Sequence, residues 1–419
     1  MATKQIPMFT INQEIDIEID IKLFDSEKEL IGETISTINM SFVPKFQATI
    51  NGVLTHKEAS DFKKVLDITY IKIKGKNTFI EVFALNIKMS GAAEFKLLPK
   101  QSSLLIGKES EIDHINFYLT NLTPSLNKEV FEIDKWKVEL NSKADYKEYK
   151  NLKKTSGFLI THEGTISRNN GSKFKRKDVH ELITFLFLSF SFINGFNSCP
   201  FYLRGMDKNN NLIWSEISNN RIDPYISISN WYEFPKSDLK SFVEGFYDFF
   251  QNSVYKNHIN EIIYWYIHSN RKGVDKSVIL THTALELISW LYLTQDKKNL
   301  SKDGLSKLNA SDNFSLTLSS CGIPIEIPPK LKELSKMARG RQNVENACKA
   351  FSLVRNKLVH PGSKQRKNLT KSDLVYEAKI LGCKFIELFI LYKSGYSGLY
   401  FDRVKYDSWK GNADPVPWS

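Results

Sequence analysis

The sequence predicts an α+β protein in which a β-rich N-terminal part precedes a helical C-terminal part. Apolar and polar residues alternate between about residues 10 and 170, as they do in half-buried strands. After Pro235 the apolar residues recur about every 3.6 positions, as in helices with one buried face. A chain of 419 residues is also too long for one ordinary core. We therefore expect domains at 1–235 and 236–395, followed by a tail at 396–419.

The N-terminal domain is predicted to be an antiparallel sandwich or barrel-like body with one packed helix. Residues 15–21 (IDIEIDI) alternate strictly, so their carboxylates should face solvent rather than bind a metal. A helix should begin near Asp178 and end at Gly195. The other strand-like runs lie at 46–54, 65–74, 78–89, 112–120, 129–140, 157–167, 201–204 and 212–214.

The C-terminal part is predicted to be an all-α bundle of four or five helices. Helical spacing covers 237–269, and residues 274–294 are apolar almost all round, which is typical of a central helix. Two more helices are expected at about 342–360 and 371–394. Residues 296–336 contain three prolines, so we expect a loop with at most short helices.

The tail carries six aromatic residues, for which we favour packing on the surface, while stacking on nucleic-acid bases stays open. These residues are Tyr396, Tyr400, Phe401, Tyr406, Trp409 and Trp418.

Composition limits the partners and the compartment. The net charge of +11 favours an anionic partner, although a solvated Lys-rich surface explains it equally well. The four cysteines are far apart and form no C-x-x-C pair, so neither structural zinc nor a disulfide framework is expected. The first 20 residues lack the apolar run of a signal peptide, and the apolar stretch 182–196 is too short to span a membrane. We expect a cytoplasmic protein.

The sequence RNKLVH at residues 355–360 is the candidate site. Arg355 falls in the middle of the apolar stripe of its predicted helix, where an unpaired cation is costly. His360 lies roughly 140° further round an ideal helix, so the two side chains do not share a face. They converge if the last turn unwinds before Pro361-Gly362, or if a second copy of the helix packs alongside. The geometry thus favours a composite site in a homodimer. In a purely structural alternative, Arg355 bonds carbonyls at the helix end and His360 caps it.

This motif resembles the R-x(4–6)-H signature of HEPN domains, which often have a polar residue directly after the arginine. Ala284-Leu285-Glu286 also looks like the acidic second helix of that fold, and the order of β-rich half and bundle is similar to Apea-type HEPN proteins of bacteria. The resemblance implies a metal-independent endoribonuclease whose active site forms between two facing domains. Relatives of this kind are toxins and anti-phage (abortive infection) effectors that cleave tRNA or other RNA.

The resemblance also implies roles for single residues. Arg355 would hold the scissile phosphate, and His360 would act as general acid or base. Asn356 would orient His360 or bond a phosphate oxygen, and Glu286 would hold Arg355 in place, although Glu286 could equally pair with His282 one turn earlier. The products would be a 2′,3′-cyclic phosphate (or 3′-phosphate) and a 5′-hydroxyl. No cofactor or metal is implied.

Four basic residues around the motif are candidates for contacts with the RNA backbone, but a solvated loop explains the last three nearly as well. They are Lys357, Lys364, Arg366 and Lys367. Phosphate-loop, dinucleotide-binding and G-x-S-x-G motifs are absent from the sequence. Two rival interpretations remain: a nucleic-acid-binding module without catalysis, and an antitoxin-like interaction protein. For the leading interpretation, the N-terminal domain would sense a phage-derived or cellular trigger.

Overall fold

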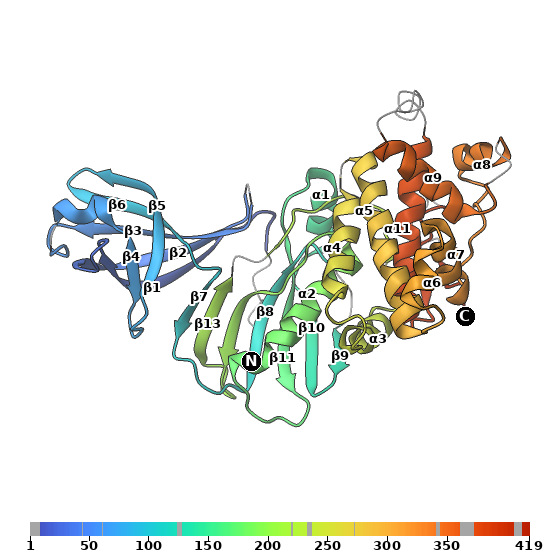
Figure 1. The fold of residues 1–419 in the computed structure, drawn as a ribbon. Coiled ribbons are helices and arrows are strands. Elements are labelled where there is room, and N and C mark those ends of the chain that lie inside the picture. Colours follow the sequence, from blue (N-terminus) through green and yellow to red (C-terminus); the bar gives the residue numbers. More distant parts are fainter. Residues whose placement is uncertain are drawn as a thin grey trace. The chain divides into compact units, whose positions relative to one another are not determined.

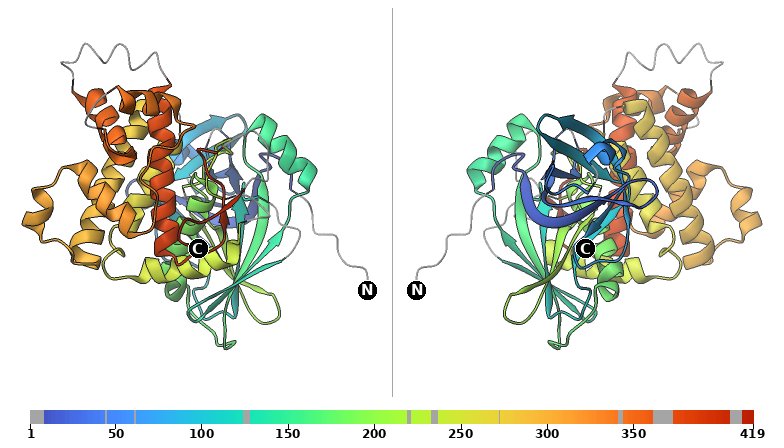
Figure 2. Two further views of the ribbon diagram at one scale, coloured as in Figure 1. Left: turned by 90° about the vertical axis from the view of Figure 1, so that its right-hand side faces the viewer. Right: turned by 90° about the vertical axis from the view of Figure 1, so that its left-hand side faces the viewer.

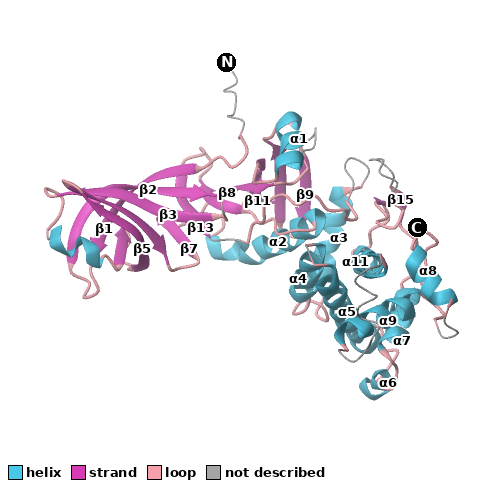
Figure 3. Cartoon of the chain, turned by 90° about the horizontal axis from the view of Figure 1, so that it is seen from above, coloured by secondary structure: helices cyan, strands magenta, loops and turns pink. Residues whose placement is uncertain are grey.

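The computed structural model divides the chain into two compact units, each described here by itself (Figure 1). The first consists of Met1–Leu186 and Ser198–Ser227, and the second of Phe187–Asn197 and Ile228–Ser419. Strands dominate the first unit and helices the second (Figure 3). The described residues are 9–43, 45–60, 62–123, 128–218, 221–232, 237–271, 273–340, 344–360, 373–405 and 413–419.

The chain begins with a closed six-stranded antiparallel barrel in the order β1-β2-β3-β6-β5-β4. Closure leaves no unpaired edge. The alternating isoleucines explain β1, because Ile19 and Ile21 face the interior while Asp20 between them lies outside. The strands are β1 (Ile15–Phe24), β2 (Leu30–Ser41), β3 (Gln47–Thr55), β4 (Tyr70–Ile73), β5 (Ile80–Met89) and β6 (Ala92–Pro99), with a 3₁₀ turn at Phe62–Asp67.

A separate seven-stranded antiparallel sheet completes the first unit, in the order β7-β13-β12-β8-β11-β10-β9. Its strands are drawn in teal and green in the two views of Figure 2. Gly164 faces Phe117 across β11 and β8, where an added Cβ would lie 2.0 Å from the Phe117 ring. The strands are β7 (Ser103–Gly107), β8 (His114–Thr120), β9 (Glu129–Ile133), β10 (Trp136–Ser142), β11 (Ile160–Arg168), β12 (Phe201–Met206) and β13 (Leu212–Ser218). Helix α1 (Tyr146–Thr155) belongs to this unit. Helix α2 (His180–Asn194), which a 3₁₀ turn at Arg176–Val179 precedes, begins in this unit and belongs to the second unit from Phe187 on.

The second unit is helical, and its longest helix, α11, packs against α3, α4, α5, α8 and α9. Its helices are α3 (Leu239–Gln251), α4 (Ile259–Asn270), α5 (Val274–Trp290), α6 (Lys302–Ser306), α7 (Ala310–Ser320), α8 (Lys332–Arg339), α9 (Ala347–Val359) and α11 (Leu374–Lys393). A π-helical turn at Leu291–Asp296 continues α5. The C-terminal segment packs onto this unit, because Phe401 is buried and the Trp418 ring packs edge-on against Tyr392 of α11, with 5.4 Å between ring centroids. Tyr406 and Trp409 lie outside the described residues.

The α+β class agrees with the structure overall, but the architecture predicted for each half is wrong. The strands form a closed barrel and a second sheet instead of one body. The unpredicted helix α1 accompanies them, and the predicted helix, α2, is divided between the two units. The C-terminal part is not all-α, because β14 (Leu399–Tyr400) pairs with β15 (Asp414–Pro415). Alternation identifies strands but carries no information on which strands pair, so it cannot separate a barrel from a sandwich.

No described helix combines the length and apolar character that crossing a bilayer requires.

We expect Gly382→Ala to destabilise the helical unit by about 1–3 kcal/mol, because a Cβ there would overpack the contact of α11 with α5 and α9. That Cβ would lie 2.5 Å from the Thr281 hydroxyl and 2.9 Å from the Phe351 ring. Urea unfolding measures the loss. The matched control is Gly340→Ala, where the nearest atom would lie 3.5 Å away. Equal stability of the two variants would contradict the expectation.

Candidate functional site

The predicted motif lies on the last turns of α9. Asn346 starts this helix, since its side-chain oxygen accepts from the Lys349 amide at 2.9 Å. Phe351, Val354 and Leu358 are buried and fix the helix against its neighbours, whereas Arg355 is only partly buried. The arginine therefore lies at the margin of the buried face, where its guanidinium can meet both protein and solvent.

The Arg355 guanidinium has few partners. Its Nη1 donates to the Asn356 side-chain oxygen at 3.2 Å, while its Nε is buried without a hydrogen-bond partner. Within the described ranges no carboxylate forms an ion pair with it, and no helix-end carbonyl accepts from it. The guanidinium is always charged, and its unpaired N–H groups can donate hydrogen bonds to a bound anion.

Glu286 lies on α5, one turn after a buried histidine. Its Oε2 is 3.6 Å from the His282 Nδ1, a distance longer than a hydrogen bond. The Glu286 side chain is 47% exposed, whereas that of His282 is 2% exposed. The structure thus places Glu286 beside His282. The predicted direct contact of Glu286 with Arg355 is not seen, because no hydrogen bond or ion pair joins the two side chains among the described residues.

Both His282 and Arg355 nevertheless affect the pKa of Glu286. The pKa of the Glu286 carboxyl is lowered from its ordinary value, first by the nearby His282 ring and further by the charge of Arg355. Partial burial of the carboxyl acts in the opposite direction. Glu286 therefore carries a negative charge near neutral pH within the field of Arg355.

The His282 ring connects three helices. It packs edge-on against Phe314 of α7, with 4.9 Å between ring centroids, and stacks on Phe351 of α9 at 5.7 Å. Both ring nitrogens are buried without a hydrogen-bond partner among the described residues. A neutral imidazole always has one donor and one acceptor, so this is an unusual state for a buried histidine.

His360 follows the end of α9 and is exposed. Its backbone N–H donates to the Asn356 carbonyl at 3.1 Å, which makes it the C-terminal capping residue. In the described part of the chain, no hydrogen bond or ion pair joins its ring to Arg355 or to Asn356. Asn356 itself is directed to Arg355 and does not orient His360.

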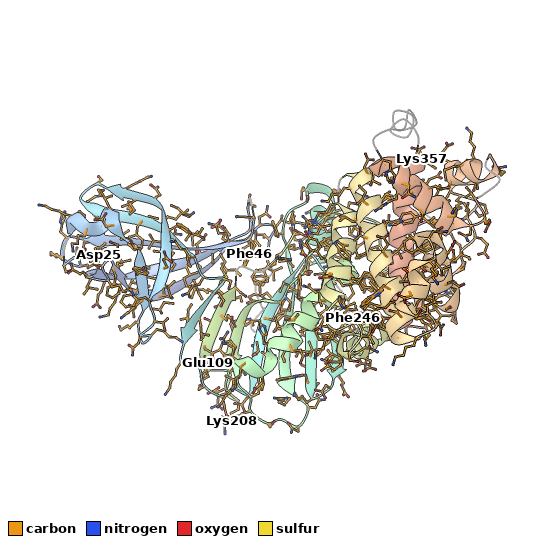
Figure 4. All side chains as sticks on the ribbon, viewed as in Figure 1. Asp25, Phe46, Glu109, Lys208, Phe246 and Lys357 are labelled. Atoms are coloured by element: carbon orange, nitrogen blue, oxygen red, sulfur yellow. The ribbon has the colours of Figure 1, made fainter. Side chains whose placement is uncertain are left out.

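Of the four predicted RNA-contacting residues, the structure describes Lys357, which lies in the last turn of α9 (Figure 4). Lys364, Arg366 and Lys367 lie outside the described residues, as does the Pro361-Gly362 stop.

Two polar residues of this region were missed as site residues. One is His282, which the sequence analysis treated only as an alternative partner of Glu286. The other is Ser352, one turn before Arg355 and Asn356, whose buried hydroxyl also has no hydrogen-bond partner. The available signal was helical spacing, because His282 lies four positions before Glu286 and Ser352 lies four positions before Asn356.

Metal chemistry was not expected from the sequence. Among the described residues, no group of three or more histidine, cysteine, aspartate or glutamate side chains is placed to hold a metal ion.

These features define an α+β protein with a closed barrel, an antiparallel sheet and a helical unit. The helical unit carries Arg355, whose guanidinium forms no ion pair among the described residues. Residues 107–228 match the family model of the YopA central domain, and residues 252–414 match that of the YopA C-terminal domain. The chain is similar to the SPbeta prophage-derived uncharacterized protein YopA of Bacillus subtilis (strain 168). The two are 27% identical over 451 residues, covering 98% of this chain and 96% of that protein. No solved structure matches.

The second match contains α4 to α11 and therefore His282, Glu286 and the motif helix. The first match contains the strands from β8 to β13. These descriptions name no activity, so the resemblance to HEPN ribonucleases stays a prediction.

Proposed function

We propose that this protein is a metal-independent endoribonuclease that cleaves tRNA or other RNA at a site on α9. The observation that carries the proposal is the Arg355 guanidinium, whose buried Nε lacks a hydrogen-bond partner and which forms no ion pair with a carboxylate among the described residues. Burial of an unpaired donor costs stability, so its presence is easier to explain when an anion completes the site. A phosphodiester accepts from such a fork through two oxygens.

The chemistry needs only side chains of this chain. The 2′-hydroxyl oxygen attacks the adjacent phosphorus, a base removes its proton, and the bond from phosphorus to the 5′-oxygen breaks as an acid protonates that oxygen. Arg355 stabilises the charge that develops on the phosphoryl oxygens. His360 supplies the imidazole that acts as general acid or base in this transfer. The products are a 2′,3′-cyclic phosphate and a 5′-hydroxyl.

We propose further that two copies of the helical unit form the site as a homodimer. Among the described residues no contact joins His360 to Arg355 within one chain, and His360 is exposed at the end of α9. A second copy related by a two-fold axis would place the imidazole of one protomer beside the guanidinium of its partner.

The similarity to a prophage-derived protein supports a role in the conflict between phage and host. We place the protein in the cytoplasm, as a toxic anti-phage effector. The strand-rich first unit would then respond to a phage-derived or cellular trigger and restrain cleavage until it is present.

Incubation of the purified full-length protein with total RNA in EDTA tests the proposal. We expect cleavage with 5′-hydroxyl ends, identified by the need for kinase treatment before ligation. His360→Ala should lower the rate about a hundredfold or more, because it removes the proton-transferring group. His258→Ala, at another partly exposed histidine of the same unit, should keep the wild-type rate. Intact RNA with every preparation would refute the enzyme, and RNA bound but uncut would favour the binding module.

A further inference from the structure

A strongly basic segment begins at the end of β11 in the first unit and covers residues 168–177. Its sequence, RNNGSKFKRK, has five basic residues and no acidic residue in ten positions. A run of like charge is ordinary when it lies on a loose, solvated loop. The contacts of this segment therefore decide whether its charges are held in place for a partner.

The side chain of Phe174 fixes the middle of the basic segment to the sheet. It is 2% exposed and packs edge-on against Trp136 of β10, with 4.8 Å between ring centroids. The Phe174 backbone also exchanges two hydrogen bonds of 3.0 Å with Ile112. Successive side chains of an extended chain point to opposite sides, so Lys173 and Lys175 lie on the outer side, and both are exposed. A fixed backbone thus presents the two lysines to solvent.

Arg168 lies against the same pair of aromatic rings. Its guanidinium carbon is 3.9 Å from the centroid of the Trp136 ring and 5.8 Å from that of Phe174. An arginine over an aromatic face keeps the N–H groups at the edge of its plane available as donors. The start of the basic segment is therefore held in place as well.

Acidic side chains neutralise only part of this charge. Arg176 pairs with Glu216 at 2.9 Å and with Glu109 at 3.3 Å. Lys173 is 3.7 Å from the Asp113 carboxylate, which is longer than a hydrogen bond. The other three basic side chains form no ion pair with any residue that the structure describes. They are Arg168, Lys175 and Lys177.

We propose that the basic segment is a second RNA-binding surface, which contacts the phosphate backbone and holds the substrate without reading its sequence. The proposal rests on the proposed function for the choice of RNA as the polyanion. A nucleic-acid strand carries one charge about every 3.4 Å, and alternate residues of an extended chain are about 6.6 Å apart. Lys173 and Lys175 therefore have a spacing at which both can contact phosphates of one strand.

The test measures how the binding of a short 2′-O-methylated RNA oligonucleotide depends on potassium chloride concentration, in EDTA and with full-length protein. The oligonucleotide stays intact because the attacking hydroxyl is blocked. Each lysine that neutralises a phosphate of a single strand adds about 0.7 to the slope of log affinity against log salt. The triple variant Lys173→Gln/Lys175→Gln/Lys177→Gln should therefore lower the slope by about 2. Its affinity near 0.1 M salt should fall about tenfold to a hundredfold.

A second triple variant is the matched control, because it removes the same charge from exposed lysines of the barrel. It is Lys57→Gln/Lys88→Gln/Lys96→Gln, and it should keep the slope of the wild type. Arg168→Gln should lower the slope by about 0.7, whereas Arg168→Lys keeps the charge and should preserve it. All these positions are exposed or partly exposed, so urea unfolding should give wild-type midpoints.

The outcomes separate this surface from the nuclease. The surface is excluded if the first triple variant keeps the wild-type slope, or if both triple variants lose affinity equally, since net charge alone then acts. Wild-type protein that binds phosphatidylserine vesicles but no RNA would also exclude it. If RNA stays intact in the cleavage assay but the first triple variant loses binding, the surface stands and the nuclease fails. If RNA is cleaved while that variant binds normally, the reverse holds.

Discussion

Arg355→Met is expected to reduce RNA cleavage about a hundredfold or more while leaving the helical unit at least as stable as the wild type. The two effects have separate causes. Methionine keeps the apolar stem against the margin of the core but removes the guanidinium that would hold the scissile phosphate. The wild-type Nε is buried without a partner, so its removal also ends an uncompensated desolvation.

This combination distinguishes a functional arginine from a structural one. An arginine that bonded helix-end carbonyls would leave them unsatisfied after substitution, and stability would fall by about 1–3 kcal/mol. The only hydrogen bond of the described guanidinium is the 3.2 Å contact with its neighbour Asn356, so we expect a change between about 0 and +1 kcal/mol. Arg355→Lys keeps the charge without the fork and should recover only part of the activity.

Cleavage rates in EDTA and urea unfolding curves measure both quantities on the same preparations. Arg339→Met is the matched control, because Arg339 ends α8 in the same unit and its Nε donates to the Ser335 carbonyl of its own helix. It should leave the rate unchanged. Destabilisation by Arg355→Met together with normal cleavage would show that Arg355 serves the fold alone.

The sequence located most elements whose pattern is strong. The alternating run 15–21 lies within β1, and the apolar run 274–294 corresponds to α5 and the π-helical turn after it. The run 129–140 is not one strand but a hairpin, β9 and β10, which turns at Asp134 with a φ of 53°. Because the alternation continues through a two-residue turn, periodicity could not detect the break.

Other elements have too few apolar residues to give a pattern. α1 buries only Tyr149 and Leu152 among its described residues, and most of its remaining side chains are charged or polar. The region 296–336 was predicted to be a loop with at most short helices, yet α7 spans eleven residues there. Its Asn309 cap was a usable local signal, since the side chain accepts from the Asp312 amide.

The site was predictable only in part, for a similar reason. Arg355 was chosen because a cation stood in an apolar stripe, and the structure places it at the margin of that stripe with a buried Nε. His282 gives no comparable signal, because a histidine on a helix is ordinary. What makes it unusual is the loss of both hydrogen bonds when Phe314 and Phe351 enclose it, and that depends on packing between helices.

The second large effect is expected at a buried ion pair that ties the C-terminal segment to the helical unit. Arg403 donates through Nε to both Glu387 oxygens, at 2.9 and 2.8 Å, and through Nη2 to Asn270 at 2.8 Å. The Tyr266 hydroxyl donates to the same carboxylate at 2.5 Å, and the Trp231 amide does so at 3.2 Å. Glu387 is 1% exposed, so water cannot replace a lost partner.

Glu387→Gln should therefore destabilise the helical unit by about 3–5 kcal/mol, because Arg403 would remain buried without a counter-charge. Arg403→Met should cost a similar amount for the opposite reason. The double variant Glu387→Leu/Arg403→Met should lose much less than the sum of the single losses, since it leaves no buried charge unpaired. Urea unfolding supplies all these values. The control is Asp414→Asn, which breaks the exposed pair with Lys405 in the same segment and should change stability by less than about 1 kcal/mol. If the single and double losses simply added, the two charges would not depend on each other, and the C-terminal segment would be held by its aromatic packing instead.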